Sequence, residues 1–189
     1  VRESGPSRHA GISHGLRWAG SAEERALVRN VYVRLELEGT ARRVFMDGTV
    51  TSAEAFEADL FRPGSLPFLV SHDGEPCGVS WLNTIEGRSA RGHYALFRAF
   101  WGRRRTIEIG RGIFRHYLGL RDARGYLFDV LIGIAPACNP LAWKLALLCG
   151  AKQQCVLPHF AYNAGTGLTE DAVLTTTTRE SLEESPCGA

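Results

Sequence analysis

Three short β-prone runs, separated by two tight turns, lie in the middle of the chain and constrain its fold more than any other feature. The runs are Phe68–Val70, Cys77–Leu82 and Arg91–Arg98. Asp73-Gly74 is a strong hairpin signal because both residue types tolerate the positive φ that a two-residue turn requires. Glu86-Gly87 lies in the second turn. Strands joined so closely pair antiparallel, so we expect a three-stranded meander at the centre of the fold.

The segment before the meander predicts two helices. Ser21-Ala22-Glu23-Glu24 is a capping box, in which each side chain satisfies a free backbone amide at the start of a helix. Gly39 is the expected stop of this helix. Thr51-Ser52-Ala53-Glu54 repeats the signature and predicts a second, shorter helix. Residues 12–18 are expected to form a first strand, and residues 40–50 show no pattern that assigns them.

The segment after the meander predicts a helix, a buried strand, a second helix and two further strands. Gly102 precedes a run with apolar residues at helical spacing, and Asp129–Ala135 follows as a buried strand. A strand, a helix and a strand in this order favour a right-handed crossover and a parallel pair. Asn139-Pro140 suits the start of the next helix, since Asn is a good N-cap and Pro a good first residue. Two further strands are expected at Gln154–Tyr162 and Ala172–Thr178.

These elements define an α+β fold with a mixed, mostly antiparallel central sheet flanked by helices on both faces. The length of 189 residues predicts one domain, at residues 11–180, with flexible tails at 1–10 and 181–189. No apolar run reaches the roughly 18 residues of a membrane span, and the first twenty residues lack a signal-peptide core. We therefore expect a cytoplasmic protein without a membrane partner. The net charge of +2 argues against nucleic acid as a partner.

The helix after the buried strand carries a spaced set of residues, with Asn at its start, Ala at +3, Leu at +6 and Gly at +11. These are Asn139, Ala142, Leu145 and Gly150. Together with the order of elements, this set resembles the GNAT acyltransferase superfamily over about residues 66–180. The layout is also similar to phage- or prophage-encoded members. Ala146 and Ala151 depart from the pattern, because the family has an aromatic residue at +7 and Phe at +12.

The resemblance implies acetyl-CoA or another acyl-CoA as cofactor. The family's acyl-CoA loop reads Gln/Arg-x-x-Gly-x-Gly/Ala, and its best register here is Arg103–Glu108, where Thr106 and Glu108 replace small residues. The residues themselves favour anion binding, because free amides and arginines at a helix start suit phosphate. The candidate phosphate-binding residues are Arg103, Arg104, Arg105, Thr106 and Ile107. The resemblance implies that the main chain of Leu96, Phe97 and Arg98 aligns the pantetheine and thioester.

Acyl transfer from a thioester to an amine requires a base for the amine, a donor for the oxyanion and a proton for the leaving thiolate. His93 is our candidate base, because it lies on the fourth strand and histidine titrates near neutral pH. A hydrogen-bonded strand histidine, Glu86 or a water-mediated base are the alternatives. The resemblance places the tyrosine that protonates the thiolate at Ala146, and Tyr117 and Tyr162 are unranked substitutes.

Asn139 is the second candidate catalytic residue, since the family position lies near the cofactor; a purely helix-capping role is the alternative. The sequence thus predicts an acyl-CoA-dependent N-acyltransferase, most simply an N-acetyltransferase, that acts by direct transfer on a small-molecule or peptide amine. Ala146 and the glycine-poor loop favour an alternative, an inactive module that binds acyl-CoA or a phage-associated partner. A nucleic-acid module using the arginines with Phe100 and Trp101 is the third reading. No cysteine and histidine spacing predicts a metal site, and a homodimer stays open.

Overall fold

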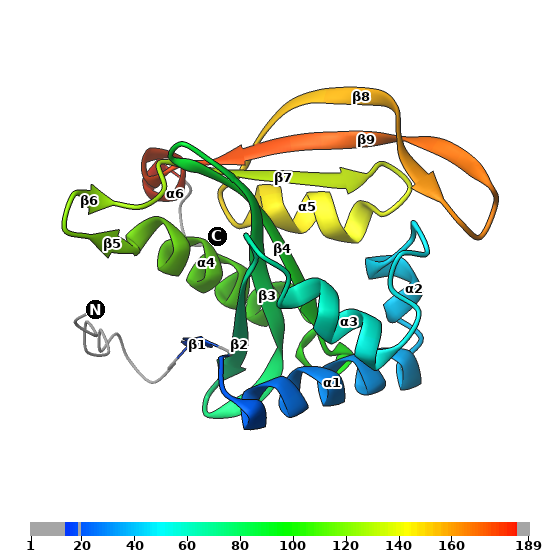
Figure 1. Cartoon of the computed structure of the whole chain (residues 1–189). Coiled ribbons are helices and arrows are strands. Elements are labelled where there is room, and N and C mark those ends of the chain that lie inside the picture. The colour runs from blue at the N-terminus through cyan, green and yellow to red at the C-terminus, as the bar shows by residue number, and fades with distance from the viewer. Residues whose placement is uncertain (1–13, 19, 185–189) are drawn as a thin grey trace.

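The computed structural model describes residues 14–18 and 20–184 of the chain (Figure 1). Within them, seven strands form one sheet in the order β1-β2-β3-β4-β7-β9-β8, and β5 pairs with β6 in a small hairpin. The strands are β1 His14–Trp18, β2 Leu66–His72, β3 Glu75–Glu86, β4 Ser89–Leu96, β5 Arg121–Asp122, β6 Gly125–Tyr126, β7 Val130–Pro136, β8 Lys152–Asn163 and β9 Leu168–Thr177. The helices are α1 Ala22–Leu37, α2 Ala41–Val44, α3 Ala53–Leu60, the 3₁₀ turn η1 Arg98–Phe100, α4 Arg103–Gly119, α5 Pro140–Leu148 and α6 Arg179–Glu184. The expected mixed, mostly antiparallel α+β architecture is confirmed.

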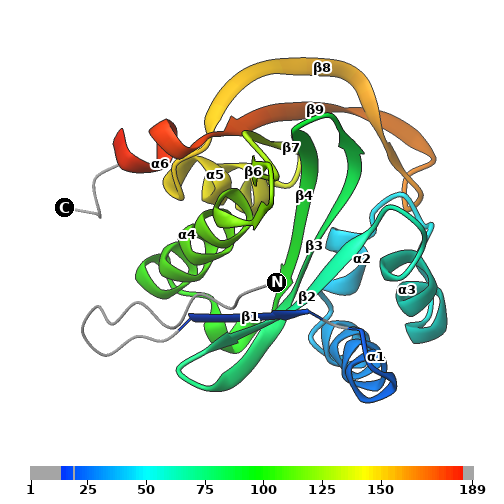
Figure 2. The same cartoon turned by 60° about the vertical axis from the view of Figure 1, so that its left-hand side comes forward.

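The helices cover both faces of the sheet. Figure 2 shows α1, α2 and α3 on one side of β2, β3 and β4, with α4, α5 and α6 on the other side. The first face is closed by a cluster of aromatic rings in which Phe45 lies 5.3 Å from Phe56 and 6.2 Å from Trp81. Phe45 follows α2 directly, so the unassigned residues 40–50 contribute a short helix and a core side chain. A four-residue helix has too few turns to produce a periodic pattern.

Local signals set the starts of the first two long helices. Ser21 accepts from the Glu24 amide while the Glu24 carboxylate accepts from the Ser21 amide, so the predicted capping box is confirmed. At α3 the N-cap is Ser52, whose hydroxyl accepts from the Ala55 amide. The second capping signature therefore begins one residue later than Thr51, where we expected it.

The meander forms as predicted. Asp73 and Gly74 have φ of 52° and 81°, which is the positive-φ pair that a two-residue hairpin requires. Gly78 lies where β2 and β3 shift register, and an added Cβ there would lie 2.1 Å from the Ala95 carbonyl oxygen on β4. Its φ of 154° also disfavours other residues. Glycine is therefore required where β3 crosses close to β4.

The C-terminal end differs from the expectation. Residues 181–184 were expected to begin a flexible tail, but they belong to α6, in which Ser181 and Leu182 are buried. Leu182 packs against Gly150, and its carbonyl accepts a 2.8 Å hydrogen bond from the buried Arg111 guanidinium of α4. The expected tails at 1–10 and 185–189 lie outside the described residues. No helix in the described part of the chain is long and apolar enough to cross a membrane.

Candidate functional site

The sheet opens between β4 and β7, which are its parallel neighbours. The two strands pair only at their first residues, from Ser89–Val130 to Arg91–Ile132. Beyond this point they diverge, as Figure 1 shows, while β4 remains paired with β3 and β7 with β9. We call the two diverging stretches, Gly92–Leu96 and Gly133–Pro136, the wedge.

On the β4 edge of the wedge, backbone groups point away from β3. In an antiparallel ladder, successive residues direct their amide and carbonyl alternately toward and away from the partner strand. The Phe97 amide donates to the Cys77 carbonyl of β3 at 2.9 Å, so Leu96, Tyr94 and Gly92 direct theirs toward the wedge. An extended chain that enters the wedge can therefore bond to β4 as an added strand would.

The main chain of Leu96, Phe97 and Arg98 was expected to align the pantetheine and thioester. The Arg98 amide donates to Glu38 Oε2 at 2.7 Å, and Glu38 caps the end of α1. The Leu96 carbonyl accepts from Trp101 Nε1 at 3.0 Å. With the Phe97 amide bonded to β3, three groups of this segment already have protein partners. The accessible part of the edge therefore centres on Tyr94.

The start of α4 lies just beyond this strand. Gly102 occupies the N-cap and has no side chain to bond the first amides of the helix, which are the free donors of any helix start. Arg104 bonds Glu108 at 3.1 Å but is 90% exposed, and Arg105 bonds the Ala99 carbonyl at 3.0 Å. The expected loop register, from Arg103 through Thr106 and Ile107 to Glu108, lies inside α4. The preceding loop, residues 98–102, contains η1 instead.

Tyr94 crosses the wedge on the α4 and α5 face. Its hydroxyl donates to the Ala142 carbonyl of α5 at 2.9 Å. Its ring lines a cavity of about 10 Å³, which is the size of a single water molecule. The other lining residues are Gly110, Ile113, Phe114, Leu145, Ala146 and Cys149. Burial and the Cys149 thiol raise the pKa of Tyr94, so its hydroxyl is protonated at neutral pH.

His93 lies on the opposite face of β4, stacked on Trp81 with ring centroids 4.9 Å apart. Its Nε2 lies 3.0 Å from Asn83 Oδ1, an acceptor, which assigns the ring proton to Nε2 and the lone pair to Nδ1. Burial, followed by the charges of Arg91 and Arg62, lowers the pKa of His93 to about 4. The imidazole is therefore neutral at pH 7 and has a lone pair to accept a proton.

Asn139 lies at the N-cap of α5, as expected, but its side chain makes no cap hydrogen bond. Its Nδ2 instead donates to the Arg43 carbonyl of α2 at 3.3 Å. Next to it, Cys138 Sγ lies 3.7 Å from Met46 Sδ, and the Met46 carbonyl accepts from the Ala164 amide at the tip of the β8–β9 hairpin. Asn139 thus helps to join α2, α5 and the hairpin around the far end of the wedge.

The remaining candidates are two tyrosines and a glutamate. Tyr117 is buried in α4 and donates at 2.7 Å to Oγ of Ser80, the β3 residue that pairs with Tyr94. Tyr162 is 49% exposed on β8, and Glu86 is exposed at the end of β3. Among the described residues, no group of three or more His, Cys, Asp and Glu side chains could hold a metal ion.

Sequence reasoning missed Tyr94 and Glu38. Tyr94 could have been found from strand alternation alone, because His93 and its neighbour must face opposite sides of the sheet. Glu38 gave no signal, since its bond to the Arg98 amide joins residues 60 positions apart.

Comparison with known proteins gives a consistent result for the fold. No protein-family model and no curated protein sequence matches the chain. Among solved structures, RimL, a ribosomal L7/L12 α-N-protein acetyltransferase in complex with coenzyme A, has a TM-score of 0.69 at 16% identity, over 89% of this chain and 95% of that chain. An acetyltransferase from Salmonella typhimurium that modifies the N-terminal serine of L7/L12 has a TM-score of 0.68 at 16% identity, over 89% of this chain and 99% of that chain.

Spermidine N-acetyltransferase from Vibrio cholerae, in complex with CoA and spermine, has a TM-score of 0.68 at 13% identity, over 90% of this chain and 98% of that chain. At such low identity the likeness shows the fold alone. These neighbours have the GNAT fold of N-acetyltransferases, so the resemblance seen in the sequence is confirmed at this level. The phage-type subgroup stays a prediction.

Proposed function

We propose that the chain is an acyl-CoA-dependent N-acyltransferase, most simply an N-acetyltransferase, that transfers the acyl group directly to an amine. The observation that carries this proposal is the wedge between β4 and β7, which opens beside the uncapped start of α4. A thioester cofactor with a phosphate-bearing end and an extended amide-containing arm requires both features: donors for its phosphates and a free strand edge for its arm.

The residues present fit such a group. The first amides of α4 have no side-chain cap, and the partial positive charge of a helix start favours an anion there. Arg104 and Arg105 add cationic donors at the surface, and Arg103 begins the helix. We assign the phosphates to Arg103–Ile107 and the arm to the wedge edge of Gly92, Tyr94 and Leu96. The proposed contact with the arm is therefore centred on Tyr94, earlier in the chain than the expected Leu96–Arg98 segment.

His93 is the proposed base. The bound cofactor supplies an activated acyl group, and this chain must bring the amine to it as a free base. His93 has a ring lone pair that can accept a hydrogen bond from the amine or from a water beside it, but with a pKa lowered to about 4 it is a weak base, so it acts on an amine that is already neutral. Asn139 is proposed to fix the loop at the far end of the wedge through its bond to the Arg43 carbonyl. An amine that enters from the α1–α3 face would meet His93 first.

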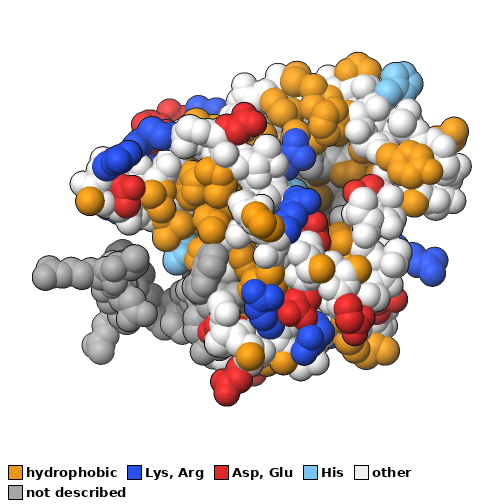
Figure 3. All heavy atoms as spheres, viewed as in Figure 1, with side chains coloured by type: hydrophobic (Ala, Val, Ile, Leu, Met, Phe, Trp, Pro, Cys, Tyr) orange, Lys and Arg blue, Asp and Glu red, His pale blue; other side chains and the backbone are white. Residues whose placement is uncertain are grey.

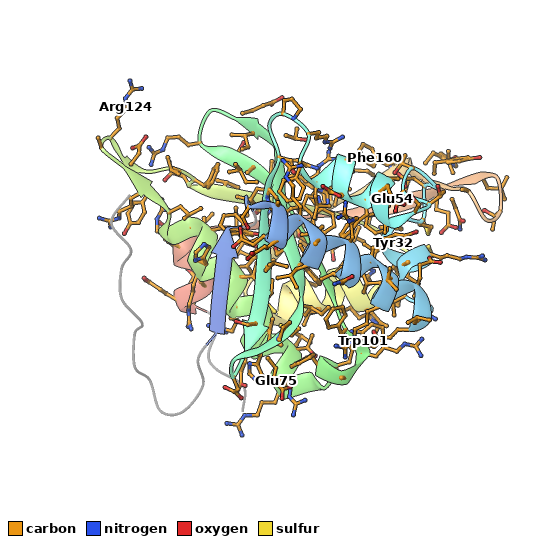
Figure 4. The ribbon with its side chains drawn as sticks, turned by 60° about the horizontal axis from the view of Figure 1, so that its bottom comes forward. Tyr32, Glu54, Glu75, Trp101, Arg124 and Phe160 are labelled. Carbon is orange, nitrogen blue, oxygen red and sulfur yellow. The ribbon has the colours of Figure 1, made fainter. Side chains whose placement is uncertain are left out.

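The test begins with binding. Calorimetric titration with acetyl-CoA and with CoA should give micromolar affinity for the wild type. Replacing Arg103, Arg104 and Arg105 by Ala should weaken it by about 10- to 100-fold, since each exposed charge contact contributes roughly 0.5–1 kcal/mol. The matched control is R121A/R124A in the β5–β6 hairpin. Figure 4 shows Arg124 at the tip of this hairpin, far from Trp101 beside the start of α4.

Turnover follows, measured as release of free thiol from acetyl-CoA with a panel of amines: a polyamine, a peptide with a free N-terminal serine and a lysine peptide. Turnover with one of them supports the proposal and assigns the acceptor class. A folded wild type that binds no CoA refutes it. Binding without turnover on any amine refutes the enzymatic part and favours a non-catalytic acyl-CoA-binding module. Binding to oligonucleotides with a steep salt dependence would favour the nucleic-acid reading instead.

Exposed apolar side chains lie along β8 and its hairpin, where Figure 3 shows a gathering of hydrophobic surface. They are Val156, Phe160, Tyr162 and Leu168. A homodimer stays a prediction, and sedimentation of the purified protein tests it.

A further inference from the structure

The face of β4 that carries His93 also carries a cationic side chain. Arg91 lies two residues before His93, so both side chains are on the same face and their Cα atoms are about 7 Å apart. Arg91 pairs with Asn83 of β3, whose Oδ1 bonds the His93 ring, and it is the last β4 residue that pairs with β7. Arg91 therefore lies at the start of the wedge, beside the proposed base.

A second arginine acts on the same ring. Arg62 follows α3, which covers this face of the sheet (Figure 2). Together with burial, the charges of Arg91 and Arg62 lower the pKa of His93, so both charges that act on the ring are positive. They also disfavour a proton on an amine bound beside the ring, and the neutral amine is the form that attacks a thioester.

Arg91 has no partner of opposite charge. In the described part of the chain, no hydrogen bond or ion pair joins its guanidinium to another group. Arg62, by contrast, lies 3.3 Å from the Asp59 carboxylate, which offsets part of its charge. Arg91 is half-buried, so its guanidinium is partly removed from water without a carboxylate to compensate. A guanidinium in this position favours an anionic ligand.

Arg91 and His93 together present the groups that an amine with a nearby anion requires. The Nδ1 lone pair of His93 can accept a hydrogen bond from an amine N–H, and a guanidinium can donate two parallel hydrogen bonds to one carboxylate. An amine with a second positive charge, such as a polyamine, would instead be repelled by Arg91 and Arg62.

We propose that the acceptor is an amine that carries a carboxylate close to its nitrogen, with Arg91 binding the carboxylate and His93 the amine. The inference rests on the proposed function and names the acceptor class for it. Two sources have this chemistry: the α-carboxylate of a free amino acid, and the acidic side chains that follow the N-terminus of a peptide.

The test compares acceptors that differ only in the anionic group, with turnover measured as release of thiol from acetyl-CoA. L-serine is paired with ethanolamine, and the amidated peptide Ser-Glu-Glu with Ser-Gln-Gln. In at least one pair, kcat/KM should be about 10- to 100-fold higher for the acceptor with the carboxylate, as expected for hydrogen bonds between charged groups. The pair that shows the preference distinguishes the free amino acid from the peptide.

Arg91→Gln is the diagnostic variant, because it keeps a polar side chain and removes the charge. It should lower the ratio of the two kcat/KM values in the preferred pair to below about three. A change in the basicity of His93 acts on both acceptors of a pair and cancels in this ratio. The matched control is Arg115→Gln, which removes an exposed arginine of α4 on the other side of the sheet and should keep the wild-type ratio.

A wild-type ratio below about 10 in both pairs overturns the inference and leaves the proposed function intact, and this result needs no variant. A folded Arg91→Gln protein that keeps the wild-type ratio also overturns it. A wild type that turns over none of these amines and none of the panel above overturns both the inference and the enzymatic proposal. The outcomes are distinguishable, because the first two require measurable turnover.

Discussion

Burial of His93 makes the stability of the fold depend on pH, and the size of the effect follows from its surroundings. The imidazole is stacked on Trp81 and lies near Arg91 and Arg62. These lower its pKa to about 4 in the folded chain, against about 6.5 in the unfolded chain. As the pH falls, the unfolded chain therefore takes up a proton first. The stabilisation is fully present above pH 6.5 and is lost as the pH falls toward 4.

Between pH 7 and pH 5 this single group should cost about 2 kcal/mol of unfolding free energy, since one pKa unit corresponds to about 1.4 kcal/mol and the unfolded histidine is largely protonated at pH 5. The assay is urea unfolding of the wild type and of His93→Gln at both pH values. The quantity of interest is the difference between the two proteins. Other groups, such as His116, whose pKa is also lowered by burial, contribute equally to both and cancel.

The matched control is His159→Gln, which removes a histidine from the exposed strand β8. Its unfolding free energy should follow that of the wild type across the same range. If the wild type and His93→Gln lose the same stability between pH 7 and pH 5, His93 is not buried as a neutral base. The assignment of its lone pair at neutral pH would then be wrong as well.

Two further predictions concern the fold around the wedge. Gly78→Ala should destabilise the chain by at least about 2 kcal/mol in urea unfolding, because its Cβ would meet the Ala95 carbonyl oxygen at 2.1 Å. The control Gly92→Ala, whose Cβ would lie 3.8 Å from Leu82 Cδ2, should change stability by less than about 1 kcal/mol. Equal effects would contradict the close approach of β3 to β4. Leu182→Ala should cost about 2–4 kcal/mol, since the side chain is 5% exposed. A neutral result would mean that residues 181–184 form the flexible tail first expected.

The parts of the fold that could be predicted from the sequence are those that depend on close neighbours in the chain. The capping box at Ser21 and the hairpin at Asp73-Gly74 are each completed within four residues. Such features need no knowledge of the tertiary structure. The order of elements then limited the topology, because a strand, a helix and a strand in sequence give a parallel pair, which is β4 with β7.

The parts that the sequence could not show depend on distant partners. Asn139 has the sequence context of an N-cap, but its side chain bonds the Arg43 carbonyl, 96 positions away. Leu182 lies in a segment rich in charge, and its burial depends on Gly150 and Arg111. The amides of Phe97 and Arg98, in the segment expected to align the thioester, bond the Cys77 carbonyl and the Glu38 carboxylate, 20 and 60 positions away. Periodicity and capping rules contain no information about such pairs.

His93, the proposed base, and its neighbour Tyr94 lie on opposite faces of the sheet. Strand geometry provides this, because consecutive side chains of β4 point to opposite faces of the sheet. His93 faces Trp81 beneath α1–α3, and Tyr94 faces Ala142 of α5. In a continuous sheet the adjacent strand fills the space beside such a pair, so no ligand can lie between the two faces. Here the pairing of β4 with β7 ends at Arg91, so a thioester held beside β4 as proposed would be open to an amine from the His93 face, while Tyr94 bonds α5 on the other face.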